Sequence, residues 1–193
     1  MPRLCVYCGS NPGFHAEYAE AARRLARLMV ARGWSLVYGG GSVGLMGIIA
    51  DAVQAAGGEV IGIIPEFLAT REILKSDCTE LHVTDSMHSR KQRMIELSDA
   101  FVALPGGYGT LEELLEAITW TQLGLHNKPV AILNTRGFFD PLIAQIDLLV
   151  GEGFVREEHR PLLRKASTPE ELLELLTLPP DPPRKKWLDA EEL

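Results

Sequence analysis

The sequence predicts an α/β fold in which a parallel sheet is covered by helices on both faces. Short, almost continuous apolar runs alternate with amphipathic helical patterns from one end of the chain to the other, as expected of strands that are buried on both faces. Glycines stand just past several helical segments, where they commonly end a helix. Because crossovers between parallel strands are right-handed, we expect a single Rossmann-like, doubly wound sheet.

The individual elements follow from local patterns, taken in order. The expected strands are the apolar runs at 3–8, 34–39, 59–64, 80–84, 100–104 and 129–134. The expected helices lie at 17–33, 45–58, 86–98, 110–124 and 139–153. In the first of these, apolar residues recur every three or four positions, which is the spacing of one buried helical face. The glycines expected to end helices are Gly33, Gly57, Gly58, Gly124 and Gly151.

The composition changes once, near the C-terminus. The chain has 193 residues, of which 46% are hydrophobic, enough for one compact domain with its own core. We assign residues 1–178 to that domain. Residues 179–193, PPDPPRKKWLDAEEL, are rich in proline and charge and are predicted to form a C-terminal tail outside it.

Charge and hydropathy exclude several classes of protein. The net charge is −7, from 19 basic and 26 acidic residues, which argues against a nucleic-acid or anionic-membrane partner. No apolar run approaches the about 18 residues that span a membrane. The first ten residues, MPRLCVYCGS, lack the apolar segment of a signal peptide, and an odd number of cysteines suggests a reducing compartment. We therefore expect a cytoplasmic protein.

Cys5 and Cys8 form a C-x-x-C pattern that would suit a redox pair or half a zinc site. Both lie in an expected strand, however, where residues three apart point to opposite faces. The third cysteine, Cys78, has no further partner near it, and the five histidines show no metal-binding spacing. We interpret Cys5 and Cys8 as small core residues and predict no metal site.

Three glycine-containing loops follow expected strands, at 8–13, 39–44 and 105–110. Ligands of open parallel sheets bind at such loops. The loop GGGSVG matches G-x-G-x-x-G, but it follows the second strand and not the first, where a dinucleotide fingerprint normally stands. Glu66, just beyond the third strand, keeps a dinucleotide-binding protein as an alternative. A Walker P-loop is excluded because no Lys-Ser/Thr pair follows the glycines.

The loop PGGYGT, residues 105–110, is the stronger candidate for holding a phosphate. It precedes a strongly helical segment, so unpaired amides at the helix start would face an anion. Thr110 could cap that helix, and with Glu113 it could form a T-x-x-E capping box, the alternative interpretation of this pair. A cap needs one special residue, whereas this loop has three glycines.

An acidic residue close to an anion site needs an explanation. If Glu113 stands in the first helical turn, the helix dipole should keep it ionised. An ionised carboxylate near a bound phosphate could hold sugar hydroxyls or stabilise positive charge that develops on a sugar ring. Both possibilities indicate a sugar phosphate as the ligand.

Arg90 shares the apolar face of the helix expected at 86–98, because it lies three residues after Met87 and four before Met94. A guanidinium on an inward face needs an anionic partner, so Arg90 is a candidate site residue. Lys91 lies beside it, and a solvated basic face is the alternative interpretation of the charges on this helix. Glu72 is a candidate acid in the loop after the third strand.

The segments SMHSRK and PGGYGTLEE, residues 86–91 and 105–113, together resemble the Lonely Guy (LOG) family. These are cytokinin riboside 5′-monophosphate phosphoribohydrolases, and relatives were long labelled "possible lysine decarboxylases". The likeness runs from about residue 3 to about residue 176 and includes GGGSVGLMG and AITWTQLG. The signature P-G-G-x-G-T-x-x-E is complete, and Arg90 with Lys91 matches the family's R-K pair.

The resemblance implies hydrolysis of the bond between an N6-modified adenine, or adenine itself, and ribose 5-phosphate. It implies a homodimer with active sites near the subunit interface, a small-molecule nucleoside monophosphate as partner, and no cofactor. Arg90 and Glu113 match the pair held essential for catalysis. Further candidate substrate-binding residues, from the resemblance and the glycine loops, are Glu72, Lys91, Gly106, Gly107, Tyr108, Gly109, Thr110, Leu111, Glu112, Thr119, Gly40, Gly41 and Ser42.

Three other functions remain as alternatives. A pyridoxal-phosphate decarboxylase would need a Schiff-base lysine at the cofactor. A non-catalytic carrier would bind a phosphorylated cofactor without cleaving it, and a dinucleotide-binding oxidoreductase would bind NAD(P). The presence of both Arg90 and Glu113 favours catalysis. The identity of the base and of its proton donor stays open at this point.

Overall fold

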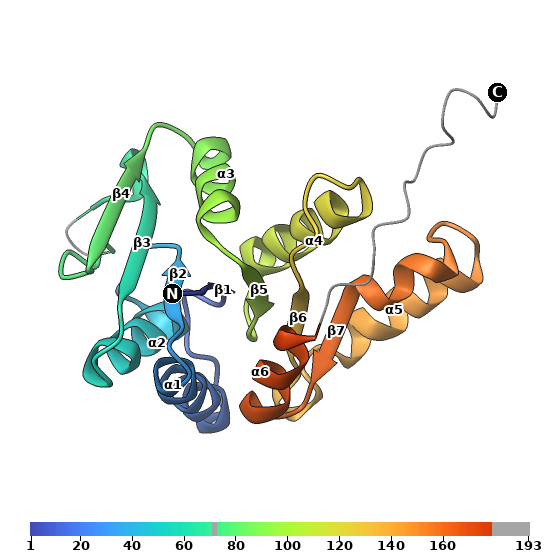
Figure 1. Cartoon of the computed structure of the whole chain (residues 1–193), viewed down its shortest axis with the longest axis horizontal. Helices are drawn as coiled ribbons and strands as arrows, with labels where there is room; N and C mark the ends of the chain where they lie inside the picture. The colour runs from blue at the N-terminus through green and yellow to red at the C-terminus, as the bar shows by residue number, and fades with distance from the viewer. Residues whose placement is uncertain (71–72, 179–193) are drawn as a thin grey trace.

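A computed structural model describes residues 1–70 and 73–178 and has one seven-stranded sheet (Figure 1). All paired strands run parallel, in the order β4-β3-β2-β1-β5-β6-β7. The strands are β1 (Arg3–Tyr7), β2 (Ser35–Tyr38), β3 (Val60–Pro65), β4 (Glu80–Thr84), β5 (Ala100–Ala103), β6 (Val130–Leu133) and β7 (Leu163–Ala166). The predicted α/β, doubly wound parallel sheet is confirmed.

Helices cover both faces of this sheet, as Figure 1 shows. One apolar core lies under α1 (Ala16–Ala31), α2 (Gly44–Ala55) and α6 (Pro169–Thr177). The other lies under α3 (Met87–Leu97), α4 (Tyr108–Gln122) and α5 (Asp140–Gly151). Three short 3-10 segments connect these elements, namely η1 (Glu66–Leu68), η2 (Thr135–Gly137) and η3 (Glu157–Leu162).

The six strands and five helices expected from the apolar pattern are all present, and two more elements complete the fold. β7 escapes the pattern because Arg164 and Lys165 interrupt it; the strand lies at an edge of the sheet, where these side chains are not fully buried. α6 follows directly. One predicted end is wrong: Gly151 belongs to α5, and the left-handed glycine past that helix is Gly153, with φ 79°.

Cys5 and Cys8 are buried free thiols on opposite faces of the sheet, as predicted. Burial raises the pKa of the Cys5 thiol to about 12, so this thiol stays protonated and unreactive at neutral pH. In the part of the chain that the structure describes, no helix is long and apolar enough to cross a membrane. The tail at 179–193 lies outside the described residues, so the division of the chain at residue 178 stays a prediction.

The strand order reverses direction at β1, whose neighbours are β2 and β5. Open α/β sheets bind ligands beyond the carboxyl ends of the strands at such a switch point. Here the three glycine loops meet: the Gly9 amide donates to the Pro105 carbonyl at 3.1 Å, and the Leu45 amide donates to the Gly9 carbonyl at 3.0 Å. The fold therefore brings together segments that are far apart in the sequence.

Candidate functional site

A cleft of about 320 Å³ opens beyond the carboxyl ends of the central strands. The glycine loops after β1, β2 and β5 all line it, and among the described residues its charged side chains are those of Arg90 and Glu113. Among the described residues that line it there is no lysine. The described part of the chain also holds no group of three His, Cys, Asp or Glu side chains placed to bind a metal.

Arg90 comes from α3, a helix capped by Ser86, whose hydroxyl accepts a hydrogen bond from the Ser89 amide. The side chain is 11% exposed, and its Nη1 lies 3.1 Å from Oε1 of Glu113. Its Nε donates to the Ile63 carbonyl at 3.2 Å. The anionic partner that the helical pattern requires for Arg90 is thus Glu113, and the two side chains form a buried ion pair at the cleft.

Glu113 stands deeper in its helix than the sequence suggests. α4 begins at Tyr108 with Gly107 as its N-cap, so the capping-box interpretation of Thr110 and Glu113 is wrong. The placement of Glu113 in the first turn is also wrong, so the helix dipole is not the interaction that favours its ionised form. Burial raises the pKa of the Glu113 carboxyl, and the positive charge of Arg90 opposes this shift.

The loop before α4 combines tight internal packing with open backbone. A Cβ on Gly106 would lie 2.1 Å from Oγ1 of Thr110, so only glycine fits there. Gly107 and Gly109 would meet nothing within 4 Å, and both line the cleft. The first amides of a helix have no intrahelical acceptor, and here the residue that precedes them, Gly107, has no side chain. This arrangement suits an anionic group that approaches the backbone.

Gly39, the residue that follows β2, makes room for the ion pair. A Cβ at this position would lie 2.3 Å from Nη2 of Arg90. The guanidinium therefore rests against backbone, and the absence of a side chain at Gly39 sets where Arg90 points.

We expect Gly39→Ala to reduce activity more than stability. The clash falls on the far end of a flexible side chain, which can shift without disturbing the core. The shift distorts the Arg90–Glu113 pair without leaving Glu113 unpaired. Turnover should fall by about tenfold to a hundredfold, because small misplacements of positioning groups cost up to about 10²-fold. Enzyme assays and thermal melts measure the two effects. Gly151→Ala, where the added Cβ meets nothing within 4 Å, is the control; an equal loss of activity in both variants would contradict the role of Gly39.

The structure divides the other predicted site residues into two groups. Gly41, Gly107, Tyr108, Gly109 and Thr110 line the cleft with the ion pair. The remaining described candidates do not appear in its lining: Gly40, Ser42, Lys91, Gly106, Leu111, Glu112 and Thr119. Glu72 lies outside the described residues.

The candidates away from the cleft have other partners. Lys91 donates to Oε1 of Glu116 at 3.0 Å and also pairs with Glu112, so it joins α3 to the outer face of α4. Thr119 bonds to the Leu115 carbonyl within α4, two turns beyond Glu113. Ser42 donates to the Ile73 carbonyl at 3.0 Å. Within one copy of the chain, these side chains do not meet at the cleft.

The G-x-G-x-x-G match is explained by packing within the chain. A Cβ on Gly44 would lie 2.2 Å from the backbone carbon of Ser10, and Gly39 faces Arg90. In this part of the structure the glycines let two loops and a guanidinium come close. No observation therefore supports a dinucleotide site at this loop.

Sequence reasoning missed the apolar part of the cleft. Met46, Ile64, Leu68 and Ile73 all contribute to its lining. These residues carry no signal of their own, because an apolar side chain in a ligand site looks the same in the sequence as one in the core.

Comparison with known proteins places this geometry in a family. Residues 46–176 match a family model described as "Possible lysine decarboxylase". The chain is 52% identical over 171 residues to "Cytokinin riboside 5'-monophosphate phosphoribohydrolase LOG" from Oryza sativa subsp. japonica, covering 89% of this chain and 71% of that protein. It is 52% identical over 174 residues to the phosphoribohydrolase LOG2 from Arabidopsis thaliana, covering 90% and 82% of the two chains.

Solved structures share the fold at lower identity. A molybdenum cofactor binding protein from Rippkaea orientalis superposes with a TM-score of 0.68 at 25% identity, over 90% of this chain and 94% of that one. The Moco carrier protein from Chlamydomonas reinhardtii gives 0.66 at 21% identity, over 90% and 93%, which shows the fold alone. The match to the family model and the identity to the plant relatives over most of the sequence decide the matter: the chain belongs to the LOG family.

Proposed function

We propose that the protein hydrolyses the N-glycosidic bond of adenosine 5′-monophosphates, with or without an N6 substituent, and releases free base and ribose 5-phosphate. One observation carries this proposal: a buried Arg90–Glu113 ion pair and the open amides at the start of α4 line the same cleft. The relatives from rice and Arabidopsis are named for this reaction on cytokinin ribosides.

In this reaction the bond between the anomeric carbon and the base nitrogen breaks, and water supplies a hydroxyl to the carbon and a proton to the base. The transition state carries oxocarbenium-like positive charge on the ribose. We assign Glu113 the stabilisation of that charge, because its carboxylate is fixed by Arg90 and water competes little at a buried position. Arg90 orients this carboxylate and the nucleotide.

The 5′-phosphate is assigned to the amides of Tyr108, Gly109 and Thr110 at the start of α4. The helix dipole and unpaired N–H groups favour an anion there, and Gly107 and Gly109 leave the approach open. Holding the phosphate one helical turn before Glu113 would place the ribose beside the carboxylate. The apolar residues of the cleft then remain for the base.

The main alternative is a carrier that binds a phosphorylated cofactor without reacting, as the names of the fold relatives suggest for those proteins. An ion pair placed at the cleft is costly to bury and is not needed for binding alone. Its presence favours catalysis.

The experiment that tests the proposal is direct. The protein is incubated with AMP and with isopentenyladenosine 5′-monophosphate, and free base and ribose 5-phosphate are measured by chromatography. We expect both products in equal amounts. Retention of intact nucleotide, with binding but no cleavage, would support the carrier instead.

We also propose that two copies of the chain associate through the face made by α4 and α5. The helix α5 has no buried residue although most of its side chains are apolar, and it projects from the body of the molecule in Figure 1. Leu148 is 55% exposed on it. An exposed apolar surface of this kind is typical of protein interfaces. Thr119 and Leu115 of α4 lie beside α5 around a common cavity, so such a dimer would bring a partner near the active site.

Leu148→Arg is expected to shift the protein from dimer to monomer in size-exclusion chromatography with light scattering. A charge in the centre of an apolar interface loses its solvation without gaining a partner. Val83→Arg is the matched control, because Val83 is equally exposed but lies on β4, at the far edge of the sheet. If both variants keep the wild-type mass, the interface is elsewhere.

We also propose that the protein is located in the cytoplasm. Cys5, Cys8 and Cys78 are all free thiols, which favours the reducing environment of the cytoplasm.

A further inference from the structure

Residues 73–79, which we call the strap, connect the region after η1 to β4 and lie across the glycine loop at 39–44. The Ser42 amide donates to the Ile73 carbonyl at 2.7 Å, and the Lys75 amide donates to the Gly40 carbonyl at 3.0 Å. Between these bonds, Gly41 and Leu74 form an isolated antiparallel bridge. The strap and the glycine loop are therefore held together by their backbones.

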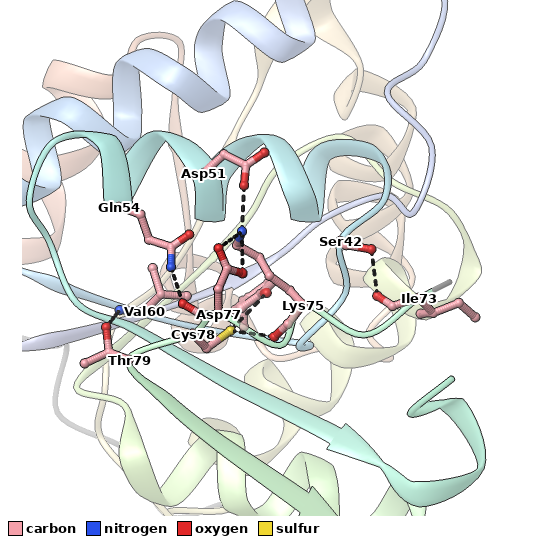
Figure 2. A network of polar contacts seen from close by, with 10 residues as sticks. Ser42, Asp51, Gln54, Val60, Ile73, Lys75, Asp77, Cys78 and Thr79 are labelled. Carbon is pink, nitrogen blue, oxygen red and sulfur yellow. Dashed lines mark hydrogen bonds and ion pairs between the residues drawn. The ribbon is translucent and has the colours of Figure 1, made fainter. Parts of the chain in front are cut away.

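The side chain of Lys75 anchors the strap to α2. Its Nζ lies 2.7 Å from Oδ1 of Asp51, on α2, and 2.9 Å from Oδ1 of Asp77, within the strap (Figure 2). The Lys75 side chain is 8% exposed, whereas the two carboxylates are 70% and 69% exposed. Burial lowers the pKa of the Lys75 ammonium, but the hydrogen bonds to both aspartates outweigh it and raise the pKa overall.

Further bonds hold the rest of the strap. The Cys78 thiol donates to the Lys75 carbonyl at 3.2 Å and contacts the Tyr38 hydroxyl at 3.6 Å. The Val60 amide donates to Oγ1 of Thr79 at 3.0 Å. Figure 2 shows Lys75 beside Asp77 and Cys78 and below Asp51, with the Val60–Thr79 bond to one side. The side-chain amide of Gln54, on α2, also donates to the Asp77 carbonyl, and the Lys75–Asp51 ion pair is the charged contact between the strap and that helix in this network.

The strap matters for the cleft because Ile73 lines it, together with Met46, Ile64 and Leu68. Under the proposed function, the phosphate occupies the start of α4 and the ribose lies at Arg90 and Glu113. The apolar lining is what remains for the base and its N6 substituent.

We propose that Lys75 is a positioning residue that clamps the strap onto the glycine loop and thereby fixes Ile73 as a wall of the base-binding end of the cleft. This inference rests on the proposed function. Lys75 does not line the cleft, so it would act on the substrate only through the strap. The consequence is selective: loosening the clamp weakens recognition of the base more than recognition of the phosphate.

The test compares Lys75→Met with wild type. We expect KM for isopentenyladenosine 5′-monophosphate to rise about tenfold, the factor that corresponds to about 1.4 kcal/mol of lost contact. KM for AMP should rise less, kcat should change little, and the inhibition constant of ribose 5-phosphate should stay the same. Lys75→Arg keeps a cation in reach of both aspartates and should restore most of the selectivity.

Two controls separate positioning from general damage. Arg24→Met removes an ion pair of the same length, 2.7 Å to Glu170, far from the glycine loops, and should leave KM unchanged. Hydrogen exchange measures the clamp without any turnover. In Lys75→Met, the backbone amides at positions 42 and 75, which donate to the Ile73 and Gly40 carbonyls, should exchange faster than in wild type.

The outcomes decide between the two proposals. If exchange of these amides is unchanged in Lys75→Met, Lys75 does not clamp the strap. If KM for isopentenyladenosine 5′-monophosphate and the inhibition constant of ribose 5-phosphate rise equally, the clamp does not act on recognition of the base. If the wild type cleaves neither nucleotide, the proposed function is wrong, and exchange alone then decides whether Lys75 clamps the strap.

Discussion

Glu113→Gln is expected to abolish measurable release of free base from AMP while the protein still binds the nucleotide. Glutamine keeps the size of the side chain and an oxygen that can accept from Arg90, but it removes the negative charge. Preorganised groups that face a developing charge contribute about 10²–10³-fold each, so kcat should fall by at least about that factor. Product release is followed by chromatography and AMP binding by calorimetry.

Glu96→Gln provides a matched control for this substitution. Glu96 lies on α3 in an exposed pair with Arg93 at 3.4 Å, and it does not line the cleft. This variant should turn over substrate at the wild-type rate. If Glu113→Gln does the same, the assigned role of Glu113 is wrong.

Arg90→Met is expected to damage both stability and activity, because it leaves the Glu113 carboxyl buried without its partner. Removing one member of a buried pair costs about 3–5 kcal/mol, and we expect a loss in this range, because the buried Glu113 carboxyl loses its cationic partner at the cleft. Urea unfolding measures the loss. Activity should fall by about as much as in Glu113→Gln, because the carboxylate is no longer held in place.

The double variant Arg90→Met/Glu113→Gln tests whether the two side chains act as a pair. With no charge left to compensate, its unfolding free energy should exceed that of Arg90→Met alone, although it stays inactive. A double variant whose stability loss equals the sum of the single losses would show that the two residues are not coupled.

The raised pKa of Glu113 also predicts a pH dependence with opposite signs for activity and stability. Activity needs the anion, so kcat/KM should fall on the acid side with a midpoint above 4.5, the ordinary value for glutamate. Stability behaves differently: the folded protein binds this proton more tightly than the unfolded chain, so ionisation of Glu113 costs stability as the pH rises through its folded pKa. An acid limb below 4.5 would argue against Glu113 as the required anion.

Much of the fold was accessible from local pattern. The type and order of most elements follow from apolar periodicity, and Arg90 was assigned to an inward face from its spacing to Met87 and Met94 alone. The strand β7 does not follow from the apolar pattern, because its charged residues hide the signal of an edge strand. The start of α4 at Tyr108 was also missed, since glycines inside a first turn look like loop.

For the site, local patterns and the family resemblance single out the loop at 105–110, Arg90 and Glu113, and the fold brings residues of that loop to one cleft with Arg90 and Glu113. Their roles in binding and catalysis stay predictions. Only the folded molecule shows that Arg90 rests on Gly39, that Glu113 is buried, and that Lys91 pairs with Glu116 outside the cleft lining. It alone brings Ile73 and the strap to the glycine loop. The reason is physical: periodicity reports which way a side chain points from its own helix or strand, whereas burial, clearance and charge pairing depend on which distant segments the sheet order brings together.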